Sequence, residues 1–483
     1  MSDASSARTP AAADANLELS PDVMRAMGRA VVDRAVAHLA SLSDQPSRGD
    51  VDAAALCRAL REPIPERGAD FELLLEHLFD ELIPRSFTTP GPGYLAYIPG
   101  GGVYPAALAD FIADTTNRYT GVWQAAPALV QLEANVLEWL REWMCFPEGT
   151  SGLLTPGGSM ATLNAILCAR ERYLGTDIRG GTLYTSDQGH HSIEKSAKLA
   201  GIFADRVRLI SADAQYRMRA DVLKAAIAAD RMAGRRPFMV VSSAGTTNTG
   251  AVDPLDAIAD VCAAEGMWHH VDGAYGAFFH AVPELRPLLA GLPRADSLTL
   301  DPHKGMFLPY GTGALLVRDG SALRAVHTAT AGYLPASTDE FYDPSQYGPE
   351  LSRGFPGLRV WLALKLFGAA RYRAAIAEKR ALAVWAAERV AQIPGVVMDA
   401  WPQLSLFAFH LEGPKLATLD ARNAATAALM ERVTARGRVM LTGCTVAGRH
   451  LARVCVLSFR TRAGEMEACV AQLAEEAERI LAS

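Results

Sequence analysis

Two segments of the chain end in side chains that could hold and activate a small molecule. Residues 269–272 (His-His-Val-Asp) form an apolar run that ends in an acid, and residues 301–304 (Asp-Pro-His-Lys) end in a primary amine. A lysine amine can bond covalently to a carbonyl group, and a carboxylate in a dry site keeps a nearby ring nitrogen protonated. Both segments are typical of strand ends, where open α/β sheets bind ligands. The sequence therefore predicts that Asp272 and Lys304 face one ligand.

A turn rich in glycine supplies a site for an anion. Residues 154–165 read as a strand end, a Gly-Gly-Ser turn and the start of a helix. The amide groups of a helix N-terminus, together with a hydroxyl, bind phosphate well. We therefore expect Gly158 and Ser159 to hold a phosphate group.

Two further segments would surround a flat ring. Residues 186–195 follow a short strand, and their first histidine, His190, could stack on a ring at the carboxyl end of that strand. Residues 238–247 form a buried-looking strand that ends in small and hydroxyl residues, which permit close approach to a ring. Thr246 is therefore a predicted contact to the rim of the ligand.

In chain order the segments give the motifs Gly-Gly-Ser, Ser-Asp-Gln-x-His, Gly-Thr-Thr, His-Val-Asp-x-Ala-Tyr and Pro-His-Lys. The set resembles the pyridoxal-phosphate-dependent amino-acid decarboxylases that include aromatic L-amino acid and glutamate decarboxylases, from about residue 20 to the C-terminus. One such motif alone is weak, whereas five in the right order and spacing are strong. The resemblance implies pyridoxal 5'-phosphate as cofactor and the aspartate-aminotransferase-like fold (fold type I). The implied site residues are Lys304 as the Schiff-base lysine, Asp272 as partner of the pyridine nitrogen, His190 as stacking imidazole, Ala274 under the ring, and Gly158 and Ser159 at the phosphate.

Each of these residues also has an ordinary structural explanation. Taken alone, Lys304 would be a solvated surface lysine, and Asp272 would be a helix cap at a strand end. The neighbouring motifs reverse this interpretation for the set as a whole. Two roles stay open for His191 and His303: each could support a residue that contacts the cofactor, or could be a hydrogen-bonded core histidine. We include His303 among the cofactor-binding residues. Two further histidines lie on a strand and are expected to be structural: His269 and His270.

A segment with glycine and threonine residues at 328–335, followed by a polar run, is typical of a mobile lid. In the family that the chain resembles, a lid tyrosine from the neighbouring subunit protonates Cα. Tyr333 matches that place through Gly-Tyr-Leu and a downstream Arg-Val-Trp, and Tyr342 and Tyr347 are its rivals. The resemblance thus implies a homodimer with active sites at the interface and Tyr333 as a catalytic residue.

The substrate side chain is expected against two apolar and aromatic stretches that resemble pocket segments of the family. Their makeup suits an aromatic substrate better than an acidic one. Arg118 could pair with a side-chain carboxylate, but an arginine beside Asn117 is as well explained as a structural hydrogen-bond donor. The predicted substrate contacts are Tyr97, Ile98, Pro99 and Trp123.

Three positions depart from the pattern of the family. Residues 354–357 are Gly-Phe-Pro-Gly, where relatives carry a more basic run. The glycines at 100–102 place no side chains beside the expected pocket. We therefore expect a wider or more mobile pocket. Asp301 stands where the named relatives have asparagine, which can donate to the phosphate. Because a carboxylate would repel a phosphate dianion nearby, we expect the Asp301 side chain to turn elsewhere.

The composition is that of an ordinary globular protein. The 483 residues are 50% hydrophobic and 21% charged, enough for a large core in more than one lobe. The formal net charge of -6 provides no basic stripe for nucleic acid, and no apolar run approaches the length of a membrane span. The seven cysteines are scattered, odd in number and without metal-ligand spacing. We therefore expect reduced thiols in the cytosol and no metal site.

Helices and strands at predictable places would position these residues. A Ser-Pro-Asp start at residues 20–22 opens an amphipathic helix to about residue 42, and another helix fits residues 70–82. Between about residues 104 and 363 helices alternate with short apolar strands, which is typical of a mostly parallel sheet covered on both faces. A long helix to about residue 392, strands near 404–410 and 453–459 and a final acidic helix complete the chain.

The sequence thus predicts an α/β protein with a mostly parallel central sheet. Its N-terminus lacks an apolar signal core, and we expect a tail there without order. The predicted parts are a tail at 1–18, an N-terminal helical dimerisation arm at 19–100, a large cofactor domain at 101–365 and a small C-terminal α+β domain at 366–483.

These features predict a cytosolic, homodimeric decarboxylase that converts an L-amino acid, preferably an aromatic one, to the amine and carbon dioxide. The alternatives are a decarboxylase for an acidic or diamino substrate, an aldehyde synthase that couples decarboxylation to oxidative deamination, a transaminase, and a non-catalytic scaffold. In the family, aldehyde formation accompanies loss of the histidine or the lid tyrosine, so that His190 and Tyr333 favour plain decarboxylation. Intact Lys304 and Asp272 speak against a scaffold.

Overall fold

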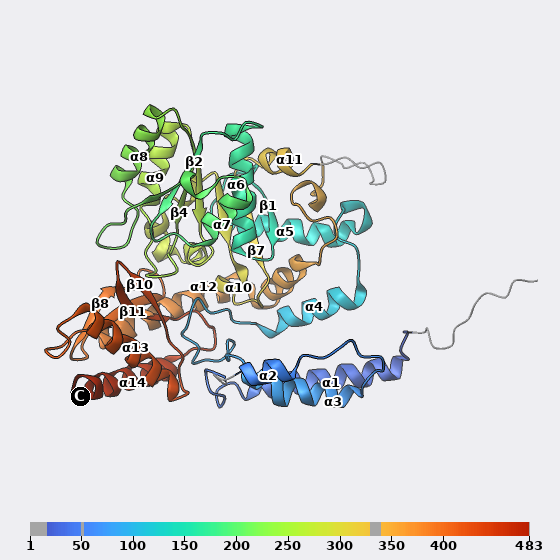
Figure 1. Cartoon of the computed structure of the whole chain (residues 1–483). Coiled ribbons are helices and arrows are strands. Elements are labelled where there is room, and N and C mark those ends of the chain that lie inside the picture. The colour runs from blue at the N-terminus through green and yellow to red at the C-terminus, as the bar shows by residue number, and fades with distance from the viewer. Residues whose placement is uncertain (1–16, 50–52, 329–339, 483) are drawn as a thin grey trace, which may run out of the picture. The chain divides into compact units, whose positions relative to one another are not determined.

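The computed structural model describes residues 17–49, 53–328 and 340–482 (Figure 1). Most of the predicted N-terminal tail and the lid residue Tyr333 lie outside the described residues. The chain divides into two compact units. One comprises the residues up to 88 except 46–48, and the other comprises 46–48 and the residues from 89 onwards.

The first unit is helical, and its two main helices begin where the sequence predicts. The Ser20 side chain accepts a hydrogen bond from the Val23 amide at 3.3 Å, and the Asp70 side chain caps the later helix in the same way. That later helix is regular at first and then continues as a π-helix, followed by a 3-10 turn. Its elements are α1 (Pro21–Ala40), α2 (Ala54–Ala59), α3 (Phe71–Glu76), the π-helix His77–Leu82 and the 3-10 turn Ile83–Arg85.

The second unit contains a seven-stranded sheet in the order β1-β7-β6-β5-β4-β2-β3. Strand β7 is antiparallel to both of its neighbours, whereas the pairs from β6 to β3 are parallel, so the predicted mostly parallel sheet is confirmed. The strands are β1 (Ser151–Thr155), β2 (Gly181–Ser186), β3 (Val207–Ile210), β4 (Arg236–Ser243), β5 (Trp268–Asp272), β6 (Ser297–Leu300) and β7 (Gly313–Val317).

Helices cover both faces of this sheet, as the apolar strands predict. Met239 and Val241 of β4 pack in the same cluster as Ala165 of α6, whereas Val240 packs with Ile258 of α9, because successive side chains of a strand point to opposite faces. The helices of this region are α4 (Tyr104–Thr116), α5 (Pro127–Trp143), α6 (Gly158–Leu174), α7 (Ser192–Leu199), α8 (Ala220–Met232), α9 (Leu255–Glu265), α10 (Pro302–Gly305) and α11 (Ser321–His327).

A second, four-stranded antiparallel sheet in the order β10-β11-β9-β8 lies in the C-terminal part of the same unit. The expected long helix before it is present as α12, but it is kinked at Gly368, whose φ of 73° is a left-handed conformation that glycine adopts without steric cost. The elements are α12 (Pro356–Val390), β8 (Val396–Ala400), β9 (Leu406–Leu411), α13 (Leu419–Ala435), β10 (Thr442–Val446), β11 (Arg449–Cys455) and α14 (Ala463–Ala482).

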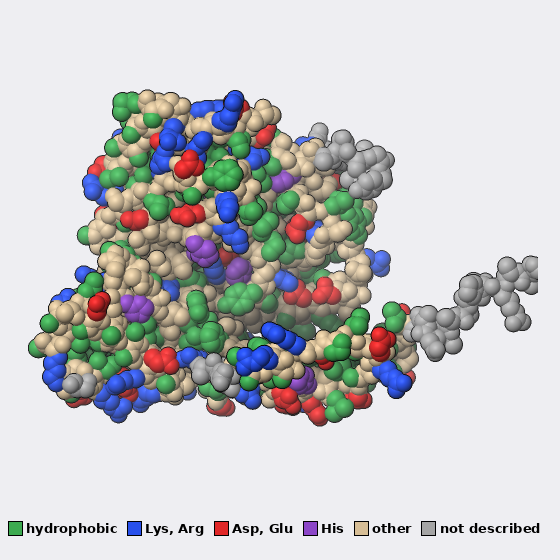
Figure 2. Space-filling view, viewed as in Figure 1, with side chains coloured by type: hydrophobic (Ala, Val, Ile, Leu, Met, Phe, Trp, Pro, Cys, Tyr) green, Lys and Arg blue, Asp and Glu red, His purple; other side chains and the backbone are tan. Residues whose placement is uncertain are grey.

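Positive and negative side chains are interspersed on the face of the molecule that Figure 2 shows. Among the described residues, none of the helices is both long enough and apolar enough to cross a membrane.

Candidate active site

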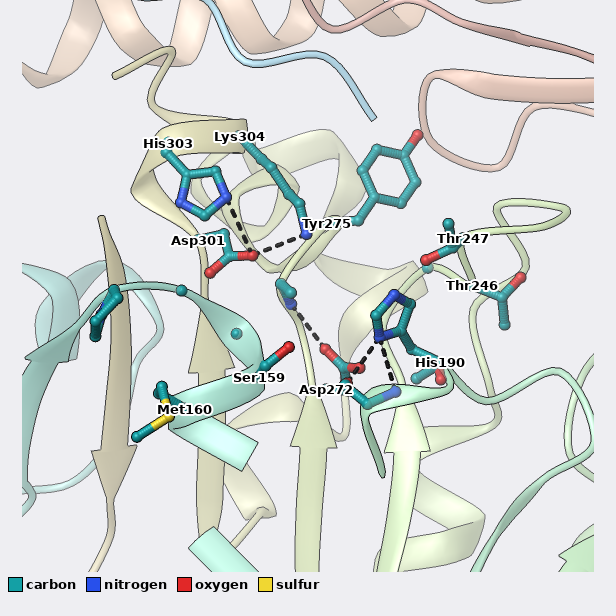
Figure 3. A pocket seen from close by; sticks show the side chains of 17 residues that line it. Ser159, Met160, His190, Thr246, Thr247, Asp272, Tyr275, Asp301, His303 and Lys304 are labelled. Atoms are coloured by element: carbon teal, nitrogen blue, oxygen red, sulfur yellow. Dashed lines mark hydrogen bonds and ion pairs between the residues drawn. The ribbon is translucent and has the colours of Figure 1, made fainter. Parts of the chain in front are cut away.

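A cavity of about 310 Å³ lies where the carboxyl ends of β4, β5 and β6 meet the N-terminus of α6 (Figure 3). This is the edge at which open α/β sheets bind ligands. All the predicted cofactor-binding residues line this cavity, although they come from segments far apart in the sequence. The lining comprises Pro156, Gly157, Gly158, Ser159, Met160, His190, Ser192, Ser243, Gly245, Thr246, Thr247, Asp272, Ala274, Tyr275, Asp301, His303 and Lys304.

Lys304 enters the cavity from α10, a single helical turn that begins with a proline directly after β6. Its Nζ atom lies 2.8 Å from Asp301 Oδ2. Asp301 is buried and lines the cavity, so the expectation that its side chain turns elsewhere is wrong. The lysine three positions later explains this, because its amine balances the buried carboxylate.

His303 is fixed on the same helical turn. Its Nδ1 atom lies 2.7 Å from the carbonyl oxygen of Thr312, and its Nε2 atom lies 3.6 Å from Asp301 Oδ2. Burial lowers the pKa of His303, which favours the neutral ring. In the neutral ring Nδ1 carries the hydrogen that it donates to the carbonyl, and Nε2 is free to accept.

Asp272 is the last residue of β5, and its carboxylate is held by the turn that follows. Its Oδ1 atom accepts a hydrogen bond of 3.1 Å from the Ala274 amide. Ala274 is buried, and its small side chain leaves room in the cavity. The turn thus fixes the Asp272 carboxylate at the end of β5, beside the small apolar side chain of Ala274.

His190 reaches the cavity from the loop before α7. Its Nδ1 atom lies 2.7 Å from the Ser192 hydroxyl oxygen and accepts from the Ser192 amide at 3.3 Å. Burial lowers the pKa of His190, and the nearby charges of Asp272 and Lys304 modify it in opposite directions. The ring is therefore neutral with its hydrogen on Nε2. The neighbouring His191 is exposed, with its ring centroid 4.2 Å from that of His190.

The N-terminus of α6 forms the wall nearest Asp301. A Cβ atom at Gly158 would lie 3.1 Å from the Ala274 Cβ atom and 3.2 Å from Asp301 Oδ2, so a larger residue would crowd both. The first turn of a helix has amide groups without partners inside the helix. The backbone amides of Gly158 and Ser159 are thus available as hydrogen-bond donors at a narrow part of the cavity.

Thr246 lines the rim of the cavity, but its hydroxyl serves the local turn. The Oγ1 atom lies 2.9 Å from Thr249 Oγ1 and accepts from the Ala251 amide at 3.2 Å. The adjacent Thr247 also lines the cavity. The Gly-Thr-Thr motif therefore shapes the loop and presents two threonines to the ligand space.

The predicted substrate contacts are not among the described residues that line the cavity: Tyr97, Ile98, Pro99 and Trp123. The Tyr97 amide donates to Thr442 at 2.9 Å, and its side chain is 53% exposed. Trp123 stacks on Phe341 with ring centroids 4.5 Å apart. Arg118 is exposed. The rival lid tyrosines pack against each other, with ring centroids 4.9 Å apart, and do not line the cavity: Tyr342 and Tyr347.

His269 and His270 are structural, as predicted. Both are buried on β5, where burial lowers their pKa values to about 3 and about 4 respectively. His269 Nε2 lies 2.8 Å from the Ser242 hydroxyl, and the other ring is bracketed by Ser297 and Thr299. They tie β5 to its two neighbours.

Two lining residues that hold other groups in place are not predicted from the sequence. Ser192 holds the His190 ring, and Tyr275 bonds through its hydroxyl to Ser405 at 3.0 Å. A serine two positions after the histidine, at the start of α7, was a usable signal for the first. The second depends on a residue far along the chain, which no local pattern reveals.

Comparison with known proteins shows the family to which the chain belongs. The model of the "Pyridoxal-dependent decarboxylase conserved domain" matches residues 54–412. The aromatic-L-amino-acid decarboxylase of Bacillus atrophaeus is 35% identical over 459 residues, which are 93% of this chain and 95% of the relative.

Solved structures with the same fold cover nearly the whole chain. Oryza sativa TDC, solved with PLP and tryptamine, has a TM-score of 0.92 at 26% identity and covers 96% of this chain and 100% of its own. Rhodiola rosea 4-hydroxyphenylacetaldehyde synthase has a TM-score of 0.89 at 25% identity and covers 96% and 99% respectively. These similarities confirm the predicted fold class.

Proposed function

Because the chain belongs to the pyridoxal-dependent decarboxylase family, we propose that it removes the α-carboxyl group of an aromatic L-amino acid and releases the amine and carbon dioxide. It is a decarboxylase whose cofactor is pyridoxal phosphate. The observation that carries the proposal is the meeting of Lys304, Asp272 and His190 in one cavity.

The residues in the cavity fit a phosphorylated pyridine aldehyde. Lys304 supplies the amine that bonds to the aldehyde, and Asp272 is the acid for the ring nitrogen. The neutral His190 ring would cover one face of the pyridine, and Ala274 would leave space for the other. Gly158 and Ser159 at the start of α6 would hold the phosphate through their amides, beside His303 and the rim residue Thr246.

Decarboxylation needs an electron acceptor and control of water and protons. When bound, pyridoxal phosphate withdraws electrons from the Cα atom of the attached amino acid. The Asp272 carboxylate keeps the ring nitrogen charged, because an ion pair in a dry site favours the protonated form. Tyr333 of a neighbouring subunit delivers the proton to Cα, and its assignment rests on the sequence motif alone.

The preference for an aromatic substrate has two supports. Similar proteins are named for aromatic substrates or were solved with tryptamine. None of the described residues that line the cavity is an arginine that could pair with a side-chain carboxylate. The aromatic stretches that contain Tyr97, Ile98, Pro99 and Trp123 supply the side-chain pocket in the complete enzyme.

The test is a product assay on a panel of amino acids. The protein loaded with pyridoxal phosphate is incubated with L-tryptophan, L-tyrosine, L-phenylalanine, L-histidine, L-glutamate and L-2,4-diaminobutyrate, and carbon dioxide and amine are measured. We expect the highest kcat/KM for an aromatic substrate and none above background for Lys304→Ala. A preference for glutamate or diaminobutyrate would contradict the substrate class, and no release from any amino acid would contradict decarboxylation.

Aldehyde synthesis is the second candidate, because the 4-hydroxyphenylacetaldehyde synthase shares the fold over nearly the whole chain. In the same assay a synthase consumes oxygen and releases hydrogen peroxide with the carbon dioxide. The retained His190 favours the amine as the main product. Hydrogen peroxide formed in proportion to carbon dioxide would instead identify aldehyde synthesis as the main reaction.

The active form is a homodimer in the cytosol, and its N-terminal helical arm at residues 19–100 contributes to the interface. Helix α1 buries none of its residues in a single chain. The apolar side chains on the arm that are between 40% and 62% exposed include Val31, Val36, Leu73 and Leu74. Exposed apolar surface of this kind is characteristic of a subunit interface. The cysteines, free in the structure, agree with a reducing compartment.

A further inference from the structure

Asp301 lies on the wall of the cavity, next to the proposed phosphate site (Figure 3). Its side chain is buried, and its Oδ2 atom lies 2.8 Å from Lys304 Nζ. The position of a Cβ atom at Gly158, in the first turn of α6, lies 3.2 Å from the same Oδ2 atom. The other oxygen, Oδ1, has no hydrogen-bond partner among the described residues. A buried acid thus faces the place where a phosphate would bind.

The neighbouring His303 supplies no positive charge to Asp301. Because its Nδ1 hydrogen is donated to the Thr312 carbonyl, the neutral ring turns the lone pair of Nε2 towards Asp301 Oδ2 at 3.6 Å. Burial lowers the pKa of His303 and so favours that neutral ring. At 3.6 Å the Nε2 atom lies beyond hydrogen-bond distance of Oδ2, and the neutral ring brings no positive charge to Asp301.

The charges around Asp301 change when the cofactor binds. Lys304 balances the carboxylate in the structure, but it is also the amine proposed to carry the cofactor. Asp272 of β5 adds a second negative charge to the cavity wall, and burial lowers the pKa of His190, which keeps that ring neutral. Arg359 of α12 forms an ion pair with Asp110 of α4. A phosphate dianion therefore meets an acid whose paired cation among the described residues, Lys304, is engaged by the cofactor.

We propose that Asp301 takes up one proton from solvent when the cofactor binds, and that the resulting carboxylic acid donates a hydrogen bond to the phosphate. No other bond is made or broken in this step. The proton removes the repulsion between two anions and turns the acid into a donor. The inference rests on the proposed function, in which Lys304 carries the cofactor and the α6 N-terminus holds its phosphate.

The first test compares cofactor binding by the wild type and Asp301→Asn, whose amide donates without a proton from solvent. Protein freed of cofactor is titrated with pyridoxal phosphate between pH 6 and 9. The titration of the free cofactor is common to both proteins and cancels in the ratio of their Kd values, whereas the changed environment of Lys304 in the variant is measured with pyridoxal. We expect the ratio of wild-type to variant Kd to rise with pH, approaching about tenfold per pH unit for one linked proton. A ratio that does not change with pH would overturn the proposal.

Two controls make the test specific. Pyridoxal lacks the phosphate but meets the same Lys304, so its ratio should rise less steeply with pH than the ratio for pyridoxal phosphate, by about one linked proton. Asp260→Asn removes an exposed carboxylate on α9, away from the cavity, and should bind like the wild type. The same pH dependence with pyridoxal as with pyridoxal phosphate would contradict donation to the phosphate.

A second measurement compares two ligands on the wild type, so its main result does not depend on the folding of the variant. Calorimetry at pH 8 in buffers of different ionisation enthalpy gives the number of protons taken up on binding. The wild type should take up about one more proton with pyridoxal phosphate than with pyridoxal, and Asp301→Asn should lose this difference. Equal uptake with both ligands would contradict the inference and leave the Lys304 assignment intact. Failure of pyridoxal phosphate to attach to Lys304 would instead contradict the proposed function.

Discussion

Replacing Asp272 by asparagine separates the electrostatic role of this residue from a structural one. In the structure its Oδ1 atom accepts one hydrogen bond of 3.1 Å from the Ala274 amide, and an asparagine carbonyl keeps that bond. What is lost is the charge opposite the ring nitrogen of the cofactor. Two opposite unit charges about 4 Å apart attract by about 4 kcal/mol at an effective dielectric constant of about 20. We therefore expect kcat to fall by about a thousandfold.

The assay combines the rate of carbon dioxide release with the thermal unfolding of the cofactor-free protein. Loss of at most one weak hydrogen bond should change the unfolding free energy by about 1 kcal/mol or less, and Tm by about 3 °C or less. Asp260→Asn, which removes an exposed carboxylate on α9, is the matched control and should keep wild-type kinetics. Activity of Asp272→Asn within a few fold of the wild type would refute the reasoning.

Three further predictions follow from other parts of the structure. Ser192→Ala removes the hydroxyl at 2.7 Å from His190 Nδ1, so cofactor affinity measured by titration should fall about fivefold, as for one lost hydrogen bond; unchanged affinity would show that the backbone alone orients the ring. Burial raises the pKa of Asp253 from 3.8 to about 6, so this carboxyl favours the folded state below about pH 4 and loses that contribution as the pH rises through about 6. In urea unfolding, Asp253→Asn should therefore gain up to about 3 kcal/mol relative to the wild type between pH 4 and 7, and a constant difference would contradict the shift. Tyr333→Phe should slow amine formation and raise the yield of peroxide per carbon dioxide, and hybrid dimers with Lys304→Ala chains should regain activity at one of their two sites; wild-type product ratios or no rescue would refute the role or its donation between subunits.

The sequence predicts best what depends on neighbouring residues. Each cofactor residue follows an apolar run and a turn, so strand ends and the start of α6 could be located from local patterns. Asp301 was misjudged although the signal was local: the expectation weighed repulsion by a phosphate, whereas Lys304 in the same helical turn supplies an opposite charge at 2.8 Å. The kink of α12 depends on the backbone conformation of Gly368, which composition does not reveal.

Contacts between distant segments could not be predicted in this way. Tyr97 is expected in a substrate pocket because its segment resembles a pocket segment of the family, and the sequence does not reveal that its amide is bonded to Thr442 of β10 and its carbonyl to Arg453 of β11. These partners come from the second sheet, and no periodicity in the sequence links them to residue 97. The place of the aromatic side chain therefore depends on tertiary structure.

The attachment of the cofactor to Lys304 is the central claim, and chemical labelling tests it most directly. Borohydride reduction of the protein loaded with pyridoxal phosphate, followed by peptide mass mapping, identifies the amine that carries the pyridoxyl group. We expect the label on the peptide that contains Lys304 and no specific label in Lys304→Ala. A label on Lys195 or Lys198 of α7 instead would contradict the assignment of Lys304.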